Sequence, residues 1–410
     1  MLKLDLINTL AFTALVLFLG YGVRRIATPL SRFNIPAPVI GGLIIAIIIT
    51  LARNAHVSLV QFDTTLQIPL MIAFFTTIGF GASMSLLKVG GPQVILFFLA
   101  SGVFAIAQNA AGILVALPLG MHPLFGVICG SVTLTGGPAT GLAFAPLFER
   151  AGVHGAASVA VAAAMCGIIS GGLIGAPIGT WLIERHRLRR QLDRPATVEL
   201  PAATDIVEMQ VSNHAPSAPH GEAKESYLLL KTLAVILAAM WAGSWVSAWF
   251  TSAGITLPAY IGAMLVAAAI RNLDDATNLI GLSRRMIDDI GSAALALFIA
   301  MALMTLKLWE LAGLALPLLA IISVQIIIIA AVCMGPIWYI MGRDYDAAVM
   351  SGGFCGFMLG TTANSMANME SLVERYGPAP RAFLVVPMVG AFLIDFSNAL
   401  IITVCLNIWG

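Results

Sequence analysis

The sequence predicts an all-α polytopic membrane protein built as an inverted repeat, with five transmembrane helices and one re-entrant hairpin in each half. Hydrophobic residues make up 59% of the 410 positions and charged residues only 10%, whereas soluble domains carry about a quarter charged residues. The apolar runs are long and do not alternate with polar residues, so a membrane β-barrel is excluded. Two polar, glycine-containing stretches, at 130–141 and 360–368, interrupt the apolar pattern at corresponding places in the two halves.

The N-terminal half is expected to cover residues 1–183. Its apolar runs predict membrane-spanning helices at about 4–22, 37–52, 66–84, 93–117 and 155–183. A hairpin at 124–147 precedes the last of these, because Gly136 and Gly137 free the backbone and Pro138 suits the start of a new helix. Such a break at membrane depth needs protein or water around its backbone groups. The alternative is a kinked helix that packs Gly and Thr against a neighbouring helix.

A polar stretch at 184–226 separates the two halves. It opens with the basic run Arg-His-Arg-Leu-Arg-Arg at 185–190 and continues in Pro, Ala, Ser, His and Glu, a composition typical of a mobile linker. The C-terminal half is expected to cover 227–410, with a hairpin at 345–371. Its apolar runs predict membrane-spanning helices at about 227–250, 258–270, 290–306, 313–340 and 380–409.

The two halves share a sequence pattern in a common order and at a nearly constant separation. The matching positions in the second and seventh spans are Pro38 with Pro258, Gly41 with Gly262, and Arg53-Asn54 with Arg271-Asn272. Because each half has an odd number of spans, the second half enters the membrane from the opposite side. The repeat is therefore predicted to be inverted.

The distribution of basic residues predicts the orientation. Placing the linker in the cytoplasm leaves only a few basic residues outside, namely Lys3, Arg53, Arg150 and Lys307. The positive-inside rule then puts both termini outside. The hairpin at 124–147 enters from the outside and the hairpin at 345–371 from the cytoplasm, so we expect the two tips to meet near the membrane midplane.

The hairpin tips are the predicted substrate site. The second limb of each hairpin is a half-helix whose N-terminus offers free N–H groups and the positive end of its dipole, which suits a carboxylate. Asn364 and Asn368 lie four residues apart on one helix face and could orient a ligand, or could bond across a helix interface instead. The candidate substrate-binding residues are Thr135, Gly136, Gly137, Thr140, Thr361, Thr362, Asn364, Ser365 and Asn368.

A cation at the same place would need oxygen ligands. A carboxylate at mid-membrane costs about 2.5–3.5 kcal/mol on insertion scales, so Asp395 is expected to have a function, although it could have a structural partner instead. The amides of the tenth and fourth spans could likewise be ligands or structural groups. The candidate cation ligands are Asp395, Asn398, Asn109, Gln108 and Thr133. With no histidine at mid-span, sodium is the expected ion.

Several functional classes are excluded by missing motifs. The sequence has no HExxH, no GxSxG, no paired intramembrane aspartates and no Walker motif, so neither enzymatic activity nor ATP hydrolysis is expected. The five cysteines lie in apolar stretches without metal-binding spacing and are predicted to be small core residues. We expect no organic cofactor and no nucleic-acid partner. A channel or facilitator is the alternative class, but a permanent pore needs no paired hairpins.

Five motifs resemble the bacterial glutamate:sodium symporter family, and the resemblance spans nearly the whole chain. They lie at 77–79, 108–110, 131–137, 300–311 and 382–392. The resemblance implies sodium-coupled uptake of glutamate across the bacterial inner membrane, with periplasmic termini. It also implies a homodimer with a static dimerisation part and a mobile part carrying both hairpins, the elevator arrangement shared with 2-hydroxycarboxylate transporters.

The sequence departs from the typical family pattern at the hairpin tips. Where the family has Ser-Gly-Gly-His-Gly-Thr, this chain has Thr-Gly-Gly-Pro-Ala-Thr at 135–140. Where the family has Ala-Thr-Pro-Thr-Ala-Ile-Ala-Asn, this chain has Thr-Thr-Ala-Asn-Ser-Met-Ala-Asn at 361–368. These changes leave open a sodium- or proton-coupled dicarboxylate transporter on the same scaffold, with Asp395 as the proton-binding group.

Overall fold

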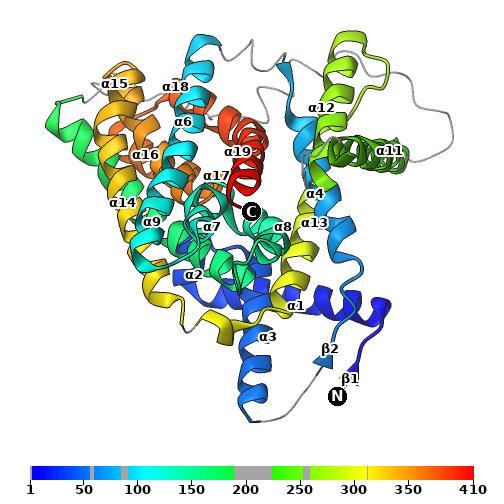
Figure 1. Cartoon of the computed structure of the whole chain (residues 1–410). Helices are drawn as coiled ribbons and strands as arrows, with labels where there is room; N and C mark the ends of the chain where they lie inside the picture. The colour runs from blue at the N-terminus through cyan, green and yellow to red at the C-terminus, as the bar shows by residue number, and fades with distance from the viewer. Residues whose placement is uncertain (1, 56–59, 85–90, 189–223, 253–258, 312) are drawn as a thin grey trace.

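A computed structural model of the chain describes residues 2–55, 60–84, 91–188, 224–252, 259–311 and 313–410 (Figure 1). Within these ranges the chain is helical apart from turns and one parallel pairing of two-residue strands, β1 (Leu2–Lys3) with β2 (Val60–Gln61). The all-helical prediction is therefore confirmed. Most of the predicted linker, residues 189–223, lies outside the described ranges.

The first half contains both short and long helices. In chain order they are α1 (Leu6–Ile26), α2 (Thr28–Arg32), α3 (Ala37–Asn54), α4 (Gln67–Gly81), α6 (Gly91–Ala116), η1 (Leu117–Leu119), α7 (Pro123–Val127), the π-helical turn η2 (Ile128–Val132), α8 (Gly137–Arg150) and α9 (Ala156–Arg185). Each predicted span corresponds to a helix of its own. The two limbs of the predicted hairpin correspond to α7 with η2 and to α8.

The second half repeats this sequence of long helices and a hairpin. In chain order its elements are α11 (Lys224–Ser252), α12 (Ala259–Thr277), α13 (Arg284–Met304), η3 (Leu308–Leu311), α14 (Ala315–Val332), the π-helical turn η4 (Cys333–Ile337), α15 (Trp338–Ile340), α16 (Tyr345–Leu359), α17 (Thr362–Tyr376), α18 (Pro380–Met388), the π-helical turn η5 (Val389–Leu393) and α19 (Ile394–Trp409).

Seven helices in the described part of the chain are long and apolar enough to cross a membrane. They are Leu6–Ile26, Ala37–Asn54, Gly91–Leu119, Ala156–Arg185, Ser226–Ser252, Arg284–Met304 and Ala315–Ile340. The other three predicted spans differ in form. Helix α4 has 15 residues, α12 carries charged residues in its last turns, and the tenth span is divided by η5 into α18 and α19.

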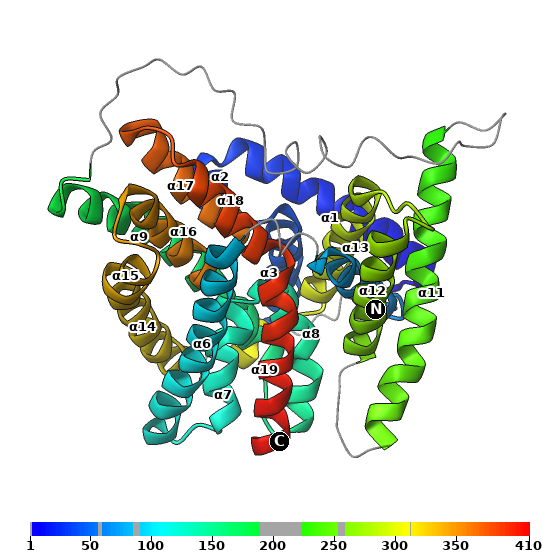
Figure 2. The same cartoon turned by 90° about the horizontal axis from the view of Figure 1, so that it is seen from above.

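The helices pack as two groups. Helices α1, α3, α4, α11, α12 and α13 contact one another, and the hairpin group contains α6 to α9 and α14 to α19. The two groups lie side by side in Figure 2. Three aromatic rings join them. Tyr260 of α12 stacks on Phe75 of α4 at 4.2 Å between ring centroids and meets the edge of Phe144 of α8 at 5.6 Å.

Glycines allow several helices to cross with their backbones in contact. A Cβ on Gly112 of α6 would lie 2.1 Å from the carbonyl oxygen of Gly126 in α7, and a Cβ on Gly126 would lie 2.3 Å from the carbonyl group of Gly112. Small residues at such crossings are the usual basis of close helix packing in membranes. This crossing fixes the first hairpin against α6.

Gly126→Ala is therefore expected to destabilise the protein. Overpacking of this kind costs typically about 1–3 kcal/mol, and here both partners are backbone atoms that cannot rotate away. Gly102→Ala, on α6 with nothing within 4 Å of its added Cβ, is the matched control and should be neutral or mildly stabilising. Thermal unfolding of the two purified variants checks this, and equal melting temperatures would contradict it.

Candidate functional site

The first hairpin contains the predicted break. Helix α7 continues into the π-helical turn η2, where Gly130 has non-helical φ and ψ of −105° and −131°, and α8 begins at Gly137. Figure 2 shows α19 between α7 and α8, and α19 contacts both of them. The hydroxyl of Thr133 donates to the carbonyl of Ile128 at 2.7 Å. The chain is thus broken between η2 and α8, and the re-entrant hairpin stays a prediction that fits this break.

The second predicted hairpin is also divided into two helices. Helix α16 ends at Leu359, and α17 begins at Thr362. The Thr361 hydroxyl caps α17 by accepting from the backbone N–H of Asn364 at 3.3 Å. The Thr362 hydroxyl donates to the carbonyl of Gly390 in η5 at 2.9 Å. The second tip is thus tied to a π-helical turn, an element often found at functional sites.

The two hairpin tips meet. Gly137 has φ of +68°, a conformation that favours glycine, and a Cβ there would lie 3.7 Å from the carbonyl oxygen of Gly360. The hydroxyl of Thr135 lies 3.4 Å from the sulfur of Met358. The N-termini of α8 and α17 therefore lie close together, as the sequence predicts.

Gln108 of α6 joins both hairpins. Its side-chain oxygen accepts from the hydroxyl of Thr135 at 2.6 Å, and its side-chain N–H donates to the carbonyl of Met358 at 2.8 Å. Gln108 is completely buried. Its neighbour Asn109 accepts from the backbone N–H of Ser131 at 2.9 Å. Both amides, predicted as cation ligands, thus bond to protein groups, which favours the structural alternative for them.

A second layer of amides lies behind Gln108 and Asn109. The side-chain N–H of Asn398 donates to the carbonyl of Ser131 at 2.9 Å, and that of Gln325 donates to the carbonyl of Gln108 at 2.6 Å. The described residues offer no partner for three buried oxygens here: Ser131 Oγ, Asn398 Oδ1 and Gln325 Oε1. A buried oxygen without a donor is costly in a protein interior. It is also a ready ligand for a cation.

The first turn of α17 repeats this pattern. The side-chain N–H groups of Asn364 and Asn368 donate to carbonyls of α9, those of Ile168 at 2.6 Å and Gly171 at 3.0 Å. These nitrogens therefore bond across a helix interface, which is the alternative role stated for the two residues above. Asn364 Oδ1 and Ser365 Oγ are buried and have no partner in the described part of the chain.

Two further predicted residues have side chains without a hydrogen bond to any described residue. Thr140 is buried in the first turn of α8, and a Cβ on Gly136 would lie 2.7 Å from its hydroxyl oxygen. Asp395 is half-buried in the first turn of α19, directly after η5. The structural partner that the sequence left open for Asp395 is not present among the described residues. Both groups are therefore available to a ligand.

Comparison with known proteins identifies the family. The sequence model of the sodium/glutamate symporter family matches residues 2–378. A sodium/glutamate symporter of Escherichia coli (strain K12) is 39% identical over 403 residues, which cover 98% of this chain and 97% of that protein. A sodium/glutamate symporter of Haemophilus influenzae is 36% identical over 398 residues, 97% of this chain and 96% of that protein. This chain belongs to the sodium/glutamate symporter family.

Membership of the sodium/glutamate symporter family confirms the resemblance predicted from the motifs. The relatives are named as symporters, so the chain is a transporter and not an enzyme. The family match extends over both hairpins.

Sequence analysis of this symporter missed two residues of the tip region, Ser131 and Gln325. Ser131 lies inside the first predicted hairpin but was not counted as a ligand candidate. Gln325 is an amide within the long apolar run of α14. It lies 217 positions after Gln108, close to the separation of the two halves. That correspondence was the available signal.

Proposed function

We propose that this symporter takes up glutamate together with sodium across the bacterial inner membrane by an elevator-type alternating-access mechanism. The observation that carries the proposal is the contact between two hairpin tips of opposite halves, bridged by Gln108, together with buried oxygens that have no partner among the described residues. The names of the relatives supply glutamate and sodium as the transported species.

The tips suit a carboxylate ligand. The N-termini of α8 and α17 present N–H groups and the positive ends of their dipoles. The hydroxyl of Thr140 is available beside them. The nearest basic side chains of the second hairpin are engaged elsewhere, with Arg375 bonded to Glu184 and Arg381 to Asp344. Backbone dipoles, hydroxyls and bound sodium would then balance the substrate's negative charge.

The unpartnered oxygens suit a sodium ion as cargo. Hard cations such as sodium take oxygen ligands, and Asn398, Ser131 and Gln325 each present one near the first tip. Asn364 and Ser365 present two more in α17. Asp395 adds a carboxylate in α19 with no partner among the described residues. Sodium bound here would satisfy oxygens that are otherwise costly to bury.

A structural correspondence between the two halves supports an inverted repeat. A Cβ on Gly41 of α3 would lie 2.1 Å from a carbonyl oxygen of α1, and a Cβ on Gly262 of α12 would lie 2.2 Å from a carbonyl oxygen of α11. The two sequence-matched glycines thus mark equivalent crossings. With the linker in the cytoplasm, both termini would be periplasmic.

The packing into two groups supports the elevator arrangement. The hairpin group would be the mobile part, and the group of α1, α3, α4 and α11 to α13 the static part that forms a homodimer. The contact of Phe144 in the hairpin group with Tyr260 in the other group is aromatic, so it can slide without breaking a charge pair. Each half would contribute helices to both parts.

Uptake by proteoliposomes tests the function. Radiolabelled glutamate should accumulate under an inward sodium gradient, and choline in place of sodium should abolish accumulation. Two or more sodium ions per glutamate would make uptake electrogenic, since each net charge is worth about 2.3 kcal/mol per 100 mV. Accumulation that ignores sodium and follows a pH gradient would overturn sodium coupling. Succinate or malate taken up in preference to glutamate would indicate the dicarboxylate alternative.

Thr140→Val is expected to weaken substrate binding without unfolding the protein. The hydroxyl has no partner in the described part of the chain, so valine removes only a contact to the ligand. A lost hydrogen bond to a charged group is worth about 1.5–3 kcal/mol, roughly ten- to hundredfold in affinity. Thr362→Val is the comparison, because it also frees the Gly390 carbonyl and should lower stability. Calorimetry in saturating sodium measures both, and normal binding by Thr140→Val would place the substrate elsewhere.

A further inference from the structure

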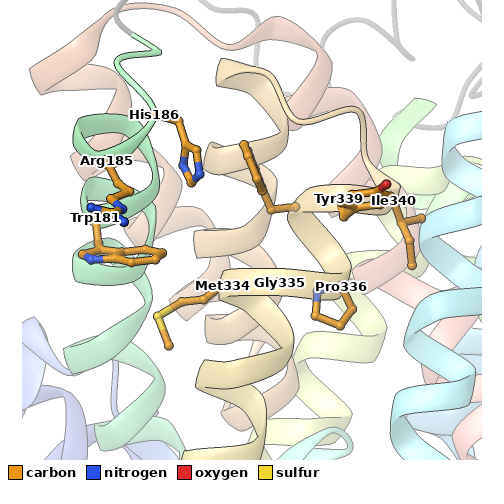
Figure 3. A pocket seen from close by; sticks show the side chains of 9 residues that line it. Trp181, Arg185, His186, Met334, Gly335, Pro336, Tyr339 and Ile340 are labelled. Atoms are coloured by element: carbon orange, nitrogen blue, oxygen red, sulfur yellow. The ribbon is translucent and has the colours of Figure 1, made fainter.

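A cavity of about 630 Å³ opens between the C-terminal end of α9 and the π-helical turn η4 with α15. Figure 3 shows Trp181, Arg185 and His186 on one side and Met334, Tyr339 and Ile340 on the other. The hairpin tips contribute none of its lining residues. It is therefore separate from the transport site.

The walls are aromatic and held in place. The imidazole of His186 stacks on the indole of Trp338 at 4.1 Å between centroids, and Trp181 meets the edge of the same imidazole at 6.3 Å. His186 Nδ1 lies 3.1 Å from the carbonyl of Leu182, to which it can only donate. The guanidinium of Arg343 covers Tyr339 at 3.5 Å from the ring centroid. The cavity thus has a defined shape.

The polar groups of the cavity are donors. None of its nine lining residues is acidic. Arg185 is exposed and has no ion-pair or hydrogen-bond partner among the described residues, and the neighbouring Glu184 is bonded to Arg375 and Tyr376 instead. The indole N–H of Trp338 is buried and lacks an acceptor in the described part of the chain. Such a site suits an anion.

The rest of the cavity surface is apolar and exposed. Met334 is 37% exposed, Ile340 42% and Trp181 47%. The cavity lies where two helices long enough to cross a membrane, Ala156–Arg185 and Ala315–Ile340, come to an end. Trp, Tyr and Arg at such helix ends are typical of the boundary between the acyl chains and the headgroups. A cationic side chain beside an apolar, lipid-facing surface matches an amphiphilic anion such as a lipid better than a small anion in solution.

We propose that this cavity binds an anionic phospholipid. Arg185 holds the phosphate, Trp338 can donate its indole N–H to a headgroup oxygen, and an acyl chain lies along Met334 and Ile340. The C-termini of α9 and α15 carry partial negative charge, so binding depends on the basic side chain of Arg185. The lipid belongs to the leaflet on the side where α9 ends with Arg185.

Lipid binding to the delipidated, full-length protein in detergent tests the site. Phosphatidylglycerol and phosphatidylcholine are titrated separately, and the bound lipid is counted by native mass spectrometry. We expect phosphatidylglycerol to bind more tightly, and Arg185→Gln to weaken it about tenfold or more, the effect of losing a charge-assisted bond. Trp181→Leu, which removes one aromatic wall, should weaken it as well.

Arg53→Gln is the matched control. Arg53 also lies in the last turn of a membrane helix and stacks on an indole, that of Trp309 at 3.8 Å, but it lines neither described cavity. It should leave lipid binding unchanged. Equal binding of the two lipids, or equal binding by wild type and Arg185→Gln, would overturn the proposal. So would glycerol 3-phosphate competing as effectively as the lipid, because the site would then recognise a free phosphate.

Discussion

Replacing Gln108 with leucine is expected to remove most of the transport activity while the protein still folds. Leucine has a similar volume but neither donor nor acceptor, so it removes one hydrogen bond from the Met358 carbonyl and leaves the Thr135 hydroxyl only the weak acceptor Met358 Sδ. Each buried group left unpaired costs about 1–3 kcal/mol. That free energy would be lost from the state in which the hairpin tips meet. Initial uptake rates in proteoliposomes should fall about ten- to hundredfold.

A double-mutant cycle separates this bridge from general packing. Thr135→Val removes the hydroxyl that Gln108 accepts, so its effect and that of Gln108→Leu should be strongly non-additive. Gln67→Leu, at the start of α4 and away from both tips, is the control and should leave uptake near normal. Additive effects, or normal uptake by Gln108→Leu, would mean that the tips do not depend on this amide.

Asp395→Asn is expected to weaken sodium binding more than glutamate binding. The carboxylate is half-buried and has no hydrogen bond to any described residue, so the amide can replace it without breaking a protein contact. Loss of a charged ligand should raise the sodium concentration for half-maximal uptake about tenfold or more. Glutamate affinity at saturating sodium should change much less, because Asp395 affects glutamate binding only through the bound sodium ion.

The sodium dependence of uptake measures this effect. Asp5→Asn is the matched control, since Asp5 is exposed, caps α1 through Asn8, and asparagine is an equally good cap. It should leave the sodium curve in place. An Asp395→Asn variant that keeps the wild-type sodium dependence, or that binds glutamate poorly at all sodium concentrations, would assign Asp395 a different role.

The helices could be predicted from the sequence because, in a membrane, the backbone N–H and C=O groups of each segment form hydrogen bonds within that segment. An apolar run of sufficient length is then both necessary and nearly sufficient for a helix, as for α1, α6 and α14. Breaks are also local, since Gly136, Gly137 and Pro138 change the backbone wherever the chain lies. The residues at which helices end were predicted less accurately. Helix α12 continues to Thr277, beyond the predicted end at 270, because charged residues can extend a helix into water.

The roles of the polar residues could not be predicted in the same way. Thr133 and Thr361 were predicted as ligands, but their hydroxyls bond to backbone groups, the Ile128 carbonyl and the Asn364 N–H. Asn364 and Asn368 place their nitrogens on carbonyls of α9, a helix nearly two hundred positions away in the chain. A side-chain amide has one donor group and one acceptor, and its sequence position does not say which of them a distant helix will use.

The sequence by itself determined that this chain is a helical membrane protein of the symporter family, with two broken hairpins in corresponding halves. Length, hydropathy and glycine or proline content are properties of each segment, so they need no knowledge of its neighbours. The tertiary structure was needed to show that Gln108 bridges the two tips and that oxygens of Ser131, Asn398 and Gln325 have no partner in the described part of the chain. Those contacts depend on which buried groups of different helices come together. Each buried polar group without a partner costs free energy.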